Sequence, residues 1–189
     1  MPSVDATPAP DAMRHPDLEI TFTPRSDGSV VFRATRADGS ATWQRHEGVR
    51  ATFFPHHDLT HYAVETVLGA RDGFYGLLAA GWDVADTGGK GARGPLPAET
   101  VLVEHLVGLL DTERVGGAPP LRAAELAMQL ETLRASGRIA TPPALTDAQL
   151  DDVRHRAVEL QDTWARSAAR GEVFTLTFAR PAASALARS

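Results

Sequence analysis

LEITFTPRSDGSVVFRATRADGSATW, residues 18–43, is the stretch that decides the fold class, because apolar and polar residues alternate along it. A period of two places alternate side chains on the same face of a β-strand. The apolar positions form three runs: Leu18, Ile20 and Phe22, then Val30, Phe32 and Ala34, then Ala41 and Trp43. SDG and ADG separate these runs and are typical of hairpin turns. The stretch therefore predicts an antiparallel β-meander whose apolar positions face inward.

After Pro55 the apolar spacing becomes helical. The spacing, with its Gly, Pro and Thr boundaries, predicts a first helix over roughly 56–69, a short helix within GFYGLLAAGWDV (73–84), and helices near 97–111, 119–136 and 146–169. EVFTLTF, residues 172–178, alternates again and predicts a strand. The chain is therefore expected to be an α+β protein with an N-terminal antiparallel β-meander, a helical layer and a C-terminal strand returning to the sheet.

The length of 189 residues suits one domain, which we place at residues 17–180. Residues 1–16 are rich in Pro, Ala and Asp, and residues 181–189 lack periodicity, so we expect two disordered tails. The first residues do not follow the pattern of an export signal. The longest apolar run, 101–110, is interrupted by Glu104 and His105 and is too short to span a bilayer. A cytoplasmic protein that does not bind membranes is expected.

Composition excludes several classes of function. The net charge is −5, which argues against a nucleic-acid-binding surface. Cysteine is absent, so a disulfide, a thiolate nucleophile and Cys-ligated zinc are excluded, and any metal must bind to His, Asp or Glu. Gly91 follows Lys90 where a phosphate-binding loop needs Ser or Thr. Arginine makes up 18 of the 19 basic residues and alanine is abundant, which indicates a bacterial source.

FFPHHDLTHYAVE, residues 53–65, carries the strongest functional signal. His57 and His61 are four residues apart, so on a helix they lie on one face and can chelate one metal ion. A helix that starts after Pro55 would place both near its positive end, which keeps imidazoles neutral. Asp58 completes an HDxxH motif, a shorter relative of HExxH, in which the acid is the general base for a metal-bound water. We therefore predict His57 and His61 as metal ligands and Asp58 as the catalytic base.

Glu65 is the third predicted metal ligand, with an alternative role left open. It lies two turns from His57, about 12 Å along the helix axis, but its side chain leans toward His61. It could thus bind the metal or accept a hydrogen bond from the ring of His61. His56 is the least secure member of the group, and His105 could complete the site from a second helix.

HDxxH followed by an acid resembles the zinc motif of the ubiquinone-biosynthesis Coq4 family, in which His, Asp, His and a downstream Glu bind the metal. That family has eleven residues between the second histidine and the Glu, which puts Gly73 at the Glu position here, beside Asp72. The resemblance covers the motif alone, because the N-terminal sheet differs from an all-helical family. HDLTHYAVE followed by GFYGLLAAGWD also resembles an uncharacterised bacterial family, which implies no activity.

Two hypotheses follow from these residues. The first is a metal-dependent enzyme, a hydrolase, that uses zinc or iron and binds a small molecule in a concave, polar pocket at the start of the first helix. The second is a non-catalytic binding or assembly module, in which Asp58 caps the helix and an apolar surface meets a partner or a second copy of the chain. Convergence of the imidazole nitrogens on one point would favour the first hypothesis, and their divergence would favour the second.

Overall fold

The structure is a computed structural model that describes residues 16–89, 93–117, 119–139, 141 and 143–186. Its sheet has four antiparallel strands in the order β3-β2-β1-β4. They are β1 (Leu18–Pro24), β2 (Val30–Arg36), β3 (Ala41–His46) and β4 (Phe174–Phe178). The predicted N-terminal meander and the C-terminal strand that returns to it are confirmed, because β4 pairs with β1. The described residues thus have the expected α+β fold.

One face of the sheet is buried. Cross-strand partners share a face, and Phe22 lies opposite Phe32 on β2 and Phe174 on β4, all three of them buried. The expected alternation is therefore correct for β1 and β2. It is wrong for β3, where Trp43 is 62% exposed and Thr42 is buried instead. The hairpin pairs Trp43 with Arg33, which is on the outer face, and this register carries Gln44 to the inner face.

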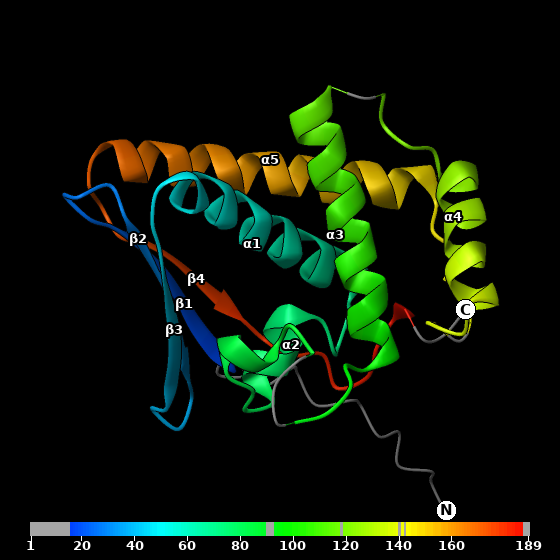
Figure 1. The fold of residues 1–189 in the computed structure, drawn as a ribbon, viewed down its shortest axis with the longest axis horizontal. Helices are drawn as coiled ribbons and strands as arrows, with labels where there is room; N and C mark the ends of the chain where they lie inside the picture. Colours follow the sequence, from blue (N-terminus) through cyan, green and yellow to red (C-terminus); the bar gives the residue numbers. More distant parts are fainter. Residues whose placement is uncertain (1–15, 90–92, 118, 140, 142, 187–189) are drawn as a thin grey trace, which may run out of the picture.

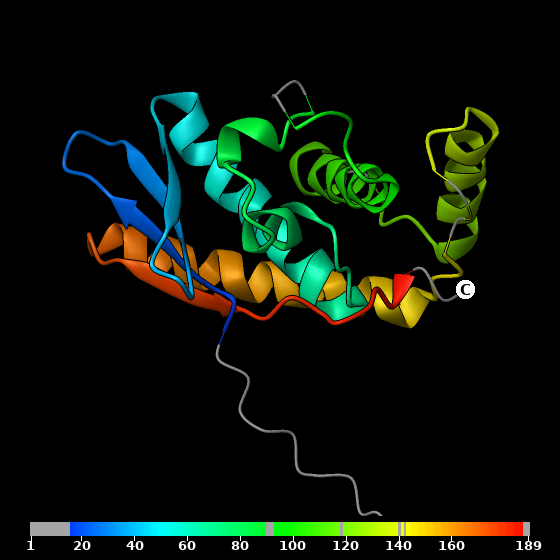
Figure 2. The same ribbon diagram turned by 90° about the horizontal axis from the view of Figure 1, so that it is seen from below.

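The helices of the described residues are α1 (Val49–Leu68), α2 (Phe74–Ala79), the 3₁₀ helix η1 (Val84–Asp86), α3 (Ala98–Gly116), α4 (Ala123–Ala135) and α5 (Asp147–Ala169). Helix α1 runs through the middle of the molecule and is contacted by α2, α3 and α5, while α4 lies at one end of the molecule (Figures 1 and 2). Both α5 and α3 pack against α1, while β2 and β3 contact it from the sheet. In α5, Trp164 lies 5.7 Å from Phe22, measured between ring centroids, so α5 also covers the sheet. None of the helices in these ranges has the length and apolar character needed to cross a membrane.

Helix α1 starts earlier than predicted, at Val49 rather than near residue 56. Pro55 lies inside it, although proline lacks the amide that an interior helical position donates. The first turns are nevertheless held by packing, because Ala51 is buried and the ring of Phe54 stacks on His46 of β3 at 4.5 Å. The two site histidines therefore lie in the body of α1. The expectation that they sit at its positive end is wrong, and Asp58 does not cap it.

The C-terminal segment also differs from expectation. Residues 181–186 were expected to belong to a disordered tail, but the structure places them against the body of the protein. The amide of Ala185 donates to the carbonyl of Gly69 at 3.0 Å, Arg71 donates to the carbonyl of Pro181 at 2.7 Å, and Leu186 is buried. These long-range contacts leave no periodic trace in so short a segment. The remaining tail residues, 1–15 and 187–189, lie outside the described residues.

Candidate metal centre

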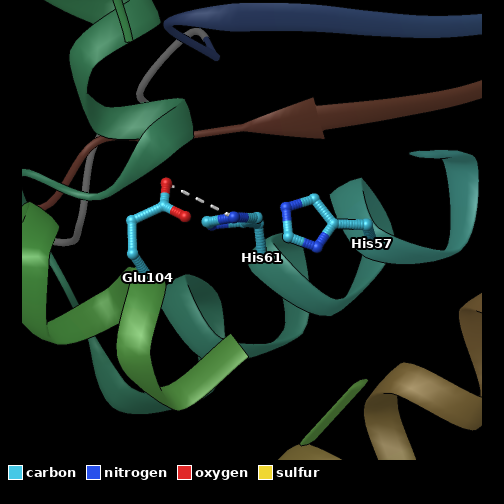
Figure 3. Close-up of side chains that lie close together, drawn as sticks. All are labelled: His57, His61 and Glu104. Atoms are coloured by element: carbon cyan, nitrogen blue, oxygen red, sulfur yellow. Dashed lines mark ion pairs between the residues drawn. The ribbon is translucent and has the colours of Figure 1, made fainter. Parts of the chain in front are cut away.

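Two helices bring three potential metal ligands together. His57 and His61 project from neighbouring turns of α1, and Glu104 reaches toward His61 from α3 (Figure 3). One ligand atom from each residue lies within 4.8 Å of those of the other two. Three atoms at such separations share a point within about 2.8 Å of each, so a modest side-chain rotation brings them to bonds of about 2.0–2.2 Å. His57, His61 and Glu104 could therefore hold a metal ion.

His57 is oriented by a carboxylate on α3. Its Nδ1 lies 2.7 Å from Oδ2 of Asp111, and the guanidinium of Arg114 lies 3.2 Å from the other oxygen. Burial opposes ionisation of Asp111, but the hydrogen bond with His57 and the charge of Arg114 hold the pKa of this carboxyl below its usual range. An ionised Asp111 accepts a hydrogen bond from Nδ1 of His57, which leaves Nε2 free to coordinate. This carboxylate–histidine pairing is common around metal sites.

His61 has a similar but looser arrangement. Its Nδ1 lies 3.7 Å from Oε1 of Glu65, and its Nε2 lies 3.6 Å from Oε1 of Glu104. Nδ1 is buried and has no hydrogen-bond partner among the described residues. Burial by itself would lower the pKa of His61, but the carboxylates of Glu104 and Glu65 raise it to about 10. The metal-free pocket thus favours a positive charge at this point, which a metal ion would also supply.

Glu65 is fully buried and is tied to the backbone rather than to the three-ligand group. Its carboxylate accepts hydrogen bonds from the amides of Tyr75 and Gly76, both at 3.1 Å. Gly73 makes this approach possible, since a Cβ there would lie 2.3 Å from Cδ of Glu65. Glu65 is outside the three-ligand group, and its Oε1 lies 3.7 Å from Nδ1 of His61, too far for the hydrogen bond that was its other expected role. The GFYG segment therefore packs closely onto this carboxylate.

Asp58 lines a cavity together with the three candidate ligands. The cavity has a volume of about 450 Å³, within the range of small-molecule sites. Asp58 is only 6% exposed, and its carboxylate makes no hydrogen bond with the described part of the chain. Burial raises the pKa of Asp58 to about 7. A group that exchanges protons near neutral pH therefore lies beside the possible metal position.

The other two histidines considered from sequence do not join the group. Nδ1 of His56 lies 2.9 Å from the carbonyl of Thr52 on its own helix. His105 lines a different cavity, with Leu133 and Arg138. Glu104 and His105 are neighbours on α3, so they point in directions about 100° apart and only one can face α1. Sequence reasoning missed Glu104 and proposed its neighbour His105 instead. The signal that could have identified Glu104 is that it interrupts the apolar run 101–110.

Comparison of the chain with family models, curated proteins and solved structures finds no match. The likeness of HDxxH to the Coq4 motif consequently stays a resemblance over five residues. Gly73, at the position of that family's Glu, packs against Glu65, and the nearby Asp72 forms an ion pair with Arg180. The case for a function accordingly depends on the geometry around His57, His61 and Glu104.

Proposed function

We propose that this protein is a metal-dependent hydrolase of a small molecule. In this proposal His57, His61 and Glu104 bind the metal, and Asp58 is the general base. The observation that carries the proposal is the convergence of two imidazoles and a carboxylate at the wall of a cavity of about 450 Å³, beside a buried acid. The binding-module hypothesis expects diverging imidazoles, so the convergence of His57 and His61 supports the enzyme.

The ligand set supports zinc as the ion. Catalytic zinc commonly has three protein ligands, two histidines and a glutamate among them, and keeps a further position open. When bound, the ion would lower the pKa of a water at the open position toward 7 and polarise a substrate carbonyl. Asp58 would hold that water and take up its proton. Ferrous iron also binds to two histidines and one carboxylate, and it is the alternative ion.

Metal content of the purified, untagged protein tests the proposal. We expect about one zinc or iron ion per wild-type chain by mass spectrometry of the metals. The His57→Ala, His61→Ala double variant and the Glu104→Ala variant should each lose most of it, because each removes part of the ligand set. His56→Ala is the matched control, since this histidine is on the same helix but outside the group. It should retain the full metal content.

A folded wild-type protein that binds no zinc or iron after resupply would contradict the proposal. Circular dichroism of each variant checks that it is folded. If Glu104→Ala kept wild-type metal content while the double histidine variant lost it, the third ligand would have to be another group. Equal loss of metal in His56→Ala would show that the effect arises from α1 as a whole and not from the ligand set.

A further inference from the structure

Aromatic side chains form much of the cavity beside the candidate metal centre. Phe32 of β2, Phe54 of α1 and Phe74 of α2 all line it. Phe74 lies 5.3 Å from His61 and Phe54 lies 6.0 Å from His57, measured between ring centroids. The apolar wall therefore begins next to the proposed ligands. If the reacting group of a substrate were bound to the metal, the rest of that substrate would lie against this wall.

With His57 and His61 bound to the metal as neutral ligands, the charged side chains left in the described lining of this cavity are acidic. Asp58 and Glu104 contribute carboxylates, and the described lining residues include no arginine or lysine. Gln44 and Thr87 are the uncharged polar members of the lining. A ligand group away from the metal would thus meet phenyl rings, an amide and a hydroxyl. A second anionic group in the cavity would face these carboxylates without a cation among the described lining residues, which is unfavourable.

On these grounds, and resting on the proposed metal centre, we infer that the substrate is an uncharged molecule with an aromatic or similarly flat apolar body, and that an acyl group is presented to the metal. An amide or ester of an aromatic acid fits this description. Phosphate esters and molecules with a carboxylate at the far end do not. The three phenylalanines would favour substrates with an apolar body. The absence of arginine and lysine from the described lining would disfavour substrates with a second anionic group.

Three hydroxamates test the inference, because a hydroxamate chelates zinc whatever else it carries. Benzohydroxamic acid has an uncharged aromatic body, acetohydroxamic acid has almost none, and 4-carboxybenzohydroxamic acid adds an anion at the far end. Titration calorimetry on the zinc-loaded, full-length protein should show benzohydroxamic acid binding about 10-fold or more tightly than either of the others, as burial of an aromatic ring implies.

The pair Phe54→Leu and Phe53→Leu separates the cavity wall from the helix. Phe54 is half-buried and lines the cavity, whereas its neighbour Phe53 is 39% exposed and does not. Phe53 also lies 5.4 Å from His57, so it controls for altered packing around that ligand. We expect Phe54→Leu to reduce the preference for benzohydroxamic over acetohydroxamic acid about 3-fold or more, and Phe53→Leu to leave it unchanged.

The outcomes distinguish the inference from the function on which it rests. Equal affinity for the aromatic and methyl probes, or tightest binding of the carboxylated probe, would overturn the inference while the metal centre stands. Binding of none of the three probes to zinc-loaded protein would contradict an open coordination position, and with it both proposals. Tightest binding of benzohydroxamic acid, with a preference that Phe54→Leu reduces and Phe53→Leu does not, would support the inferred substrate class.

Discussion

Four carboxylates surround two imidazoles at the candidate metal centre, and they occupy different positions. Glu104 faces the point where the ligand atoms converge, while Asp111 and Glu65 lie on the Nδ1 sides of the two rings. Asp58 is left at the cavity wall. So many acids in a partly dry site repel one another unless a cation is present. The position of each carboxylate relative to the two imidazoles therefore determines which role it can have: ligand, hydrogen-bond acceptor or base.

The proposed role of Asp58 can be tested separately from metal binding. We expect Asp58→Asn to retain its metal and its fold, because burial already disfavours the charged carboxylate and asparagine has a similar shape. Its kcat/KM for 4-nitrophenyl acetate, measured with zinc-loaded protein, should fall about 100-fold or more, which is typical for loss of a general base.

Asp152→Asn is the matched control for this experiment. It makes the same chemical change at an exposed position of α5, and it should leave the rate unchanged. If Asp58→Asn hydrolysed the ester at the wild-type rate while the ligand variants were inactive, Asp58 would not be the base. The metal centre would then need another group to accept the proton.

At the scale of elements, the spacing of residues within one helix was predictable and the start of the helix was not. His57 and His61 lie on one face wherever α1 begins, because the separation of four residues fixes it. The start depends on Ala51 and Phe54 packing against the sheet, which the residues near Pro55 do not reveal. The face of Trp43 was also predicted wrongly, because the register of an edge strand depends on its hairpin.

The contact between α1 and α2 depends on Gly73. Any side chain there would collide with Glu65, since a Cβ would lie 2.3 Å from its Cδ. Glu65 is fully buried beneath the first turn of α2 and has little room to move. We expect Gly73→Ala to lower the free energy of unfolding by about 1–3 kcal/mol, measured by urea denaturation, as overpacking of an interior usually does.

Gly108→Ala should change stability in the opposite direction. This glycine is in the interior of α3 and exposed, and a Cβ there would meet nothing within 4 Å. Alanine is expected to raise the free energy of unfolding by about 0.5–1 kcal/mol, because it restricts the unfolded chain and favours the helix.

A stabilising Gly73→Ala would contradict the prediction for Gly73 and would show that Glu65 is free to withdraw from α2.

At the scale of the whole molecule, the α+β class and the closing strand could be predicted because they depend on periodicity, which is local. The complete candidate site could not, because the ligand Glu104 and the hydrogen-bond acceptor Asp111 enter from α3. Their meeting with α1 depends on how α1 and α3 pack together after an intervening segment that contains α2 and η1. The motif HDxxH therefore identified two of the three candidate ligands, His57 and His61. The third, Glu104, required the tertiary structure.

Because its ligands come from α1 and α3, a bound metal would connect segments that are more than 40 positions apart in the sequence. An ion that binds the folded chain and not the unfolded one stabilises the fold by mass action, about 2.7 kcal/mol at a free concentration of 100 times Kd. For a protein of this size such a gain raises Tm by about 5–10 °C. We expect scanning calorimetry to show this rise when zinc is added to metal-free wild type and to His56→Ala. Glu104→Ala should show a much smaller rise, since it keeps only the α1 ligands and loses the connection to α3. An equal rise in Glu104→Ala would mean that zinc stabilises the protein through α1 alone or through a different site, and that α3 takes no part in the centre.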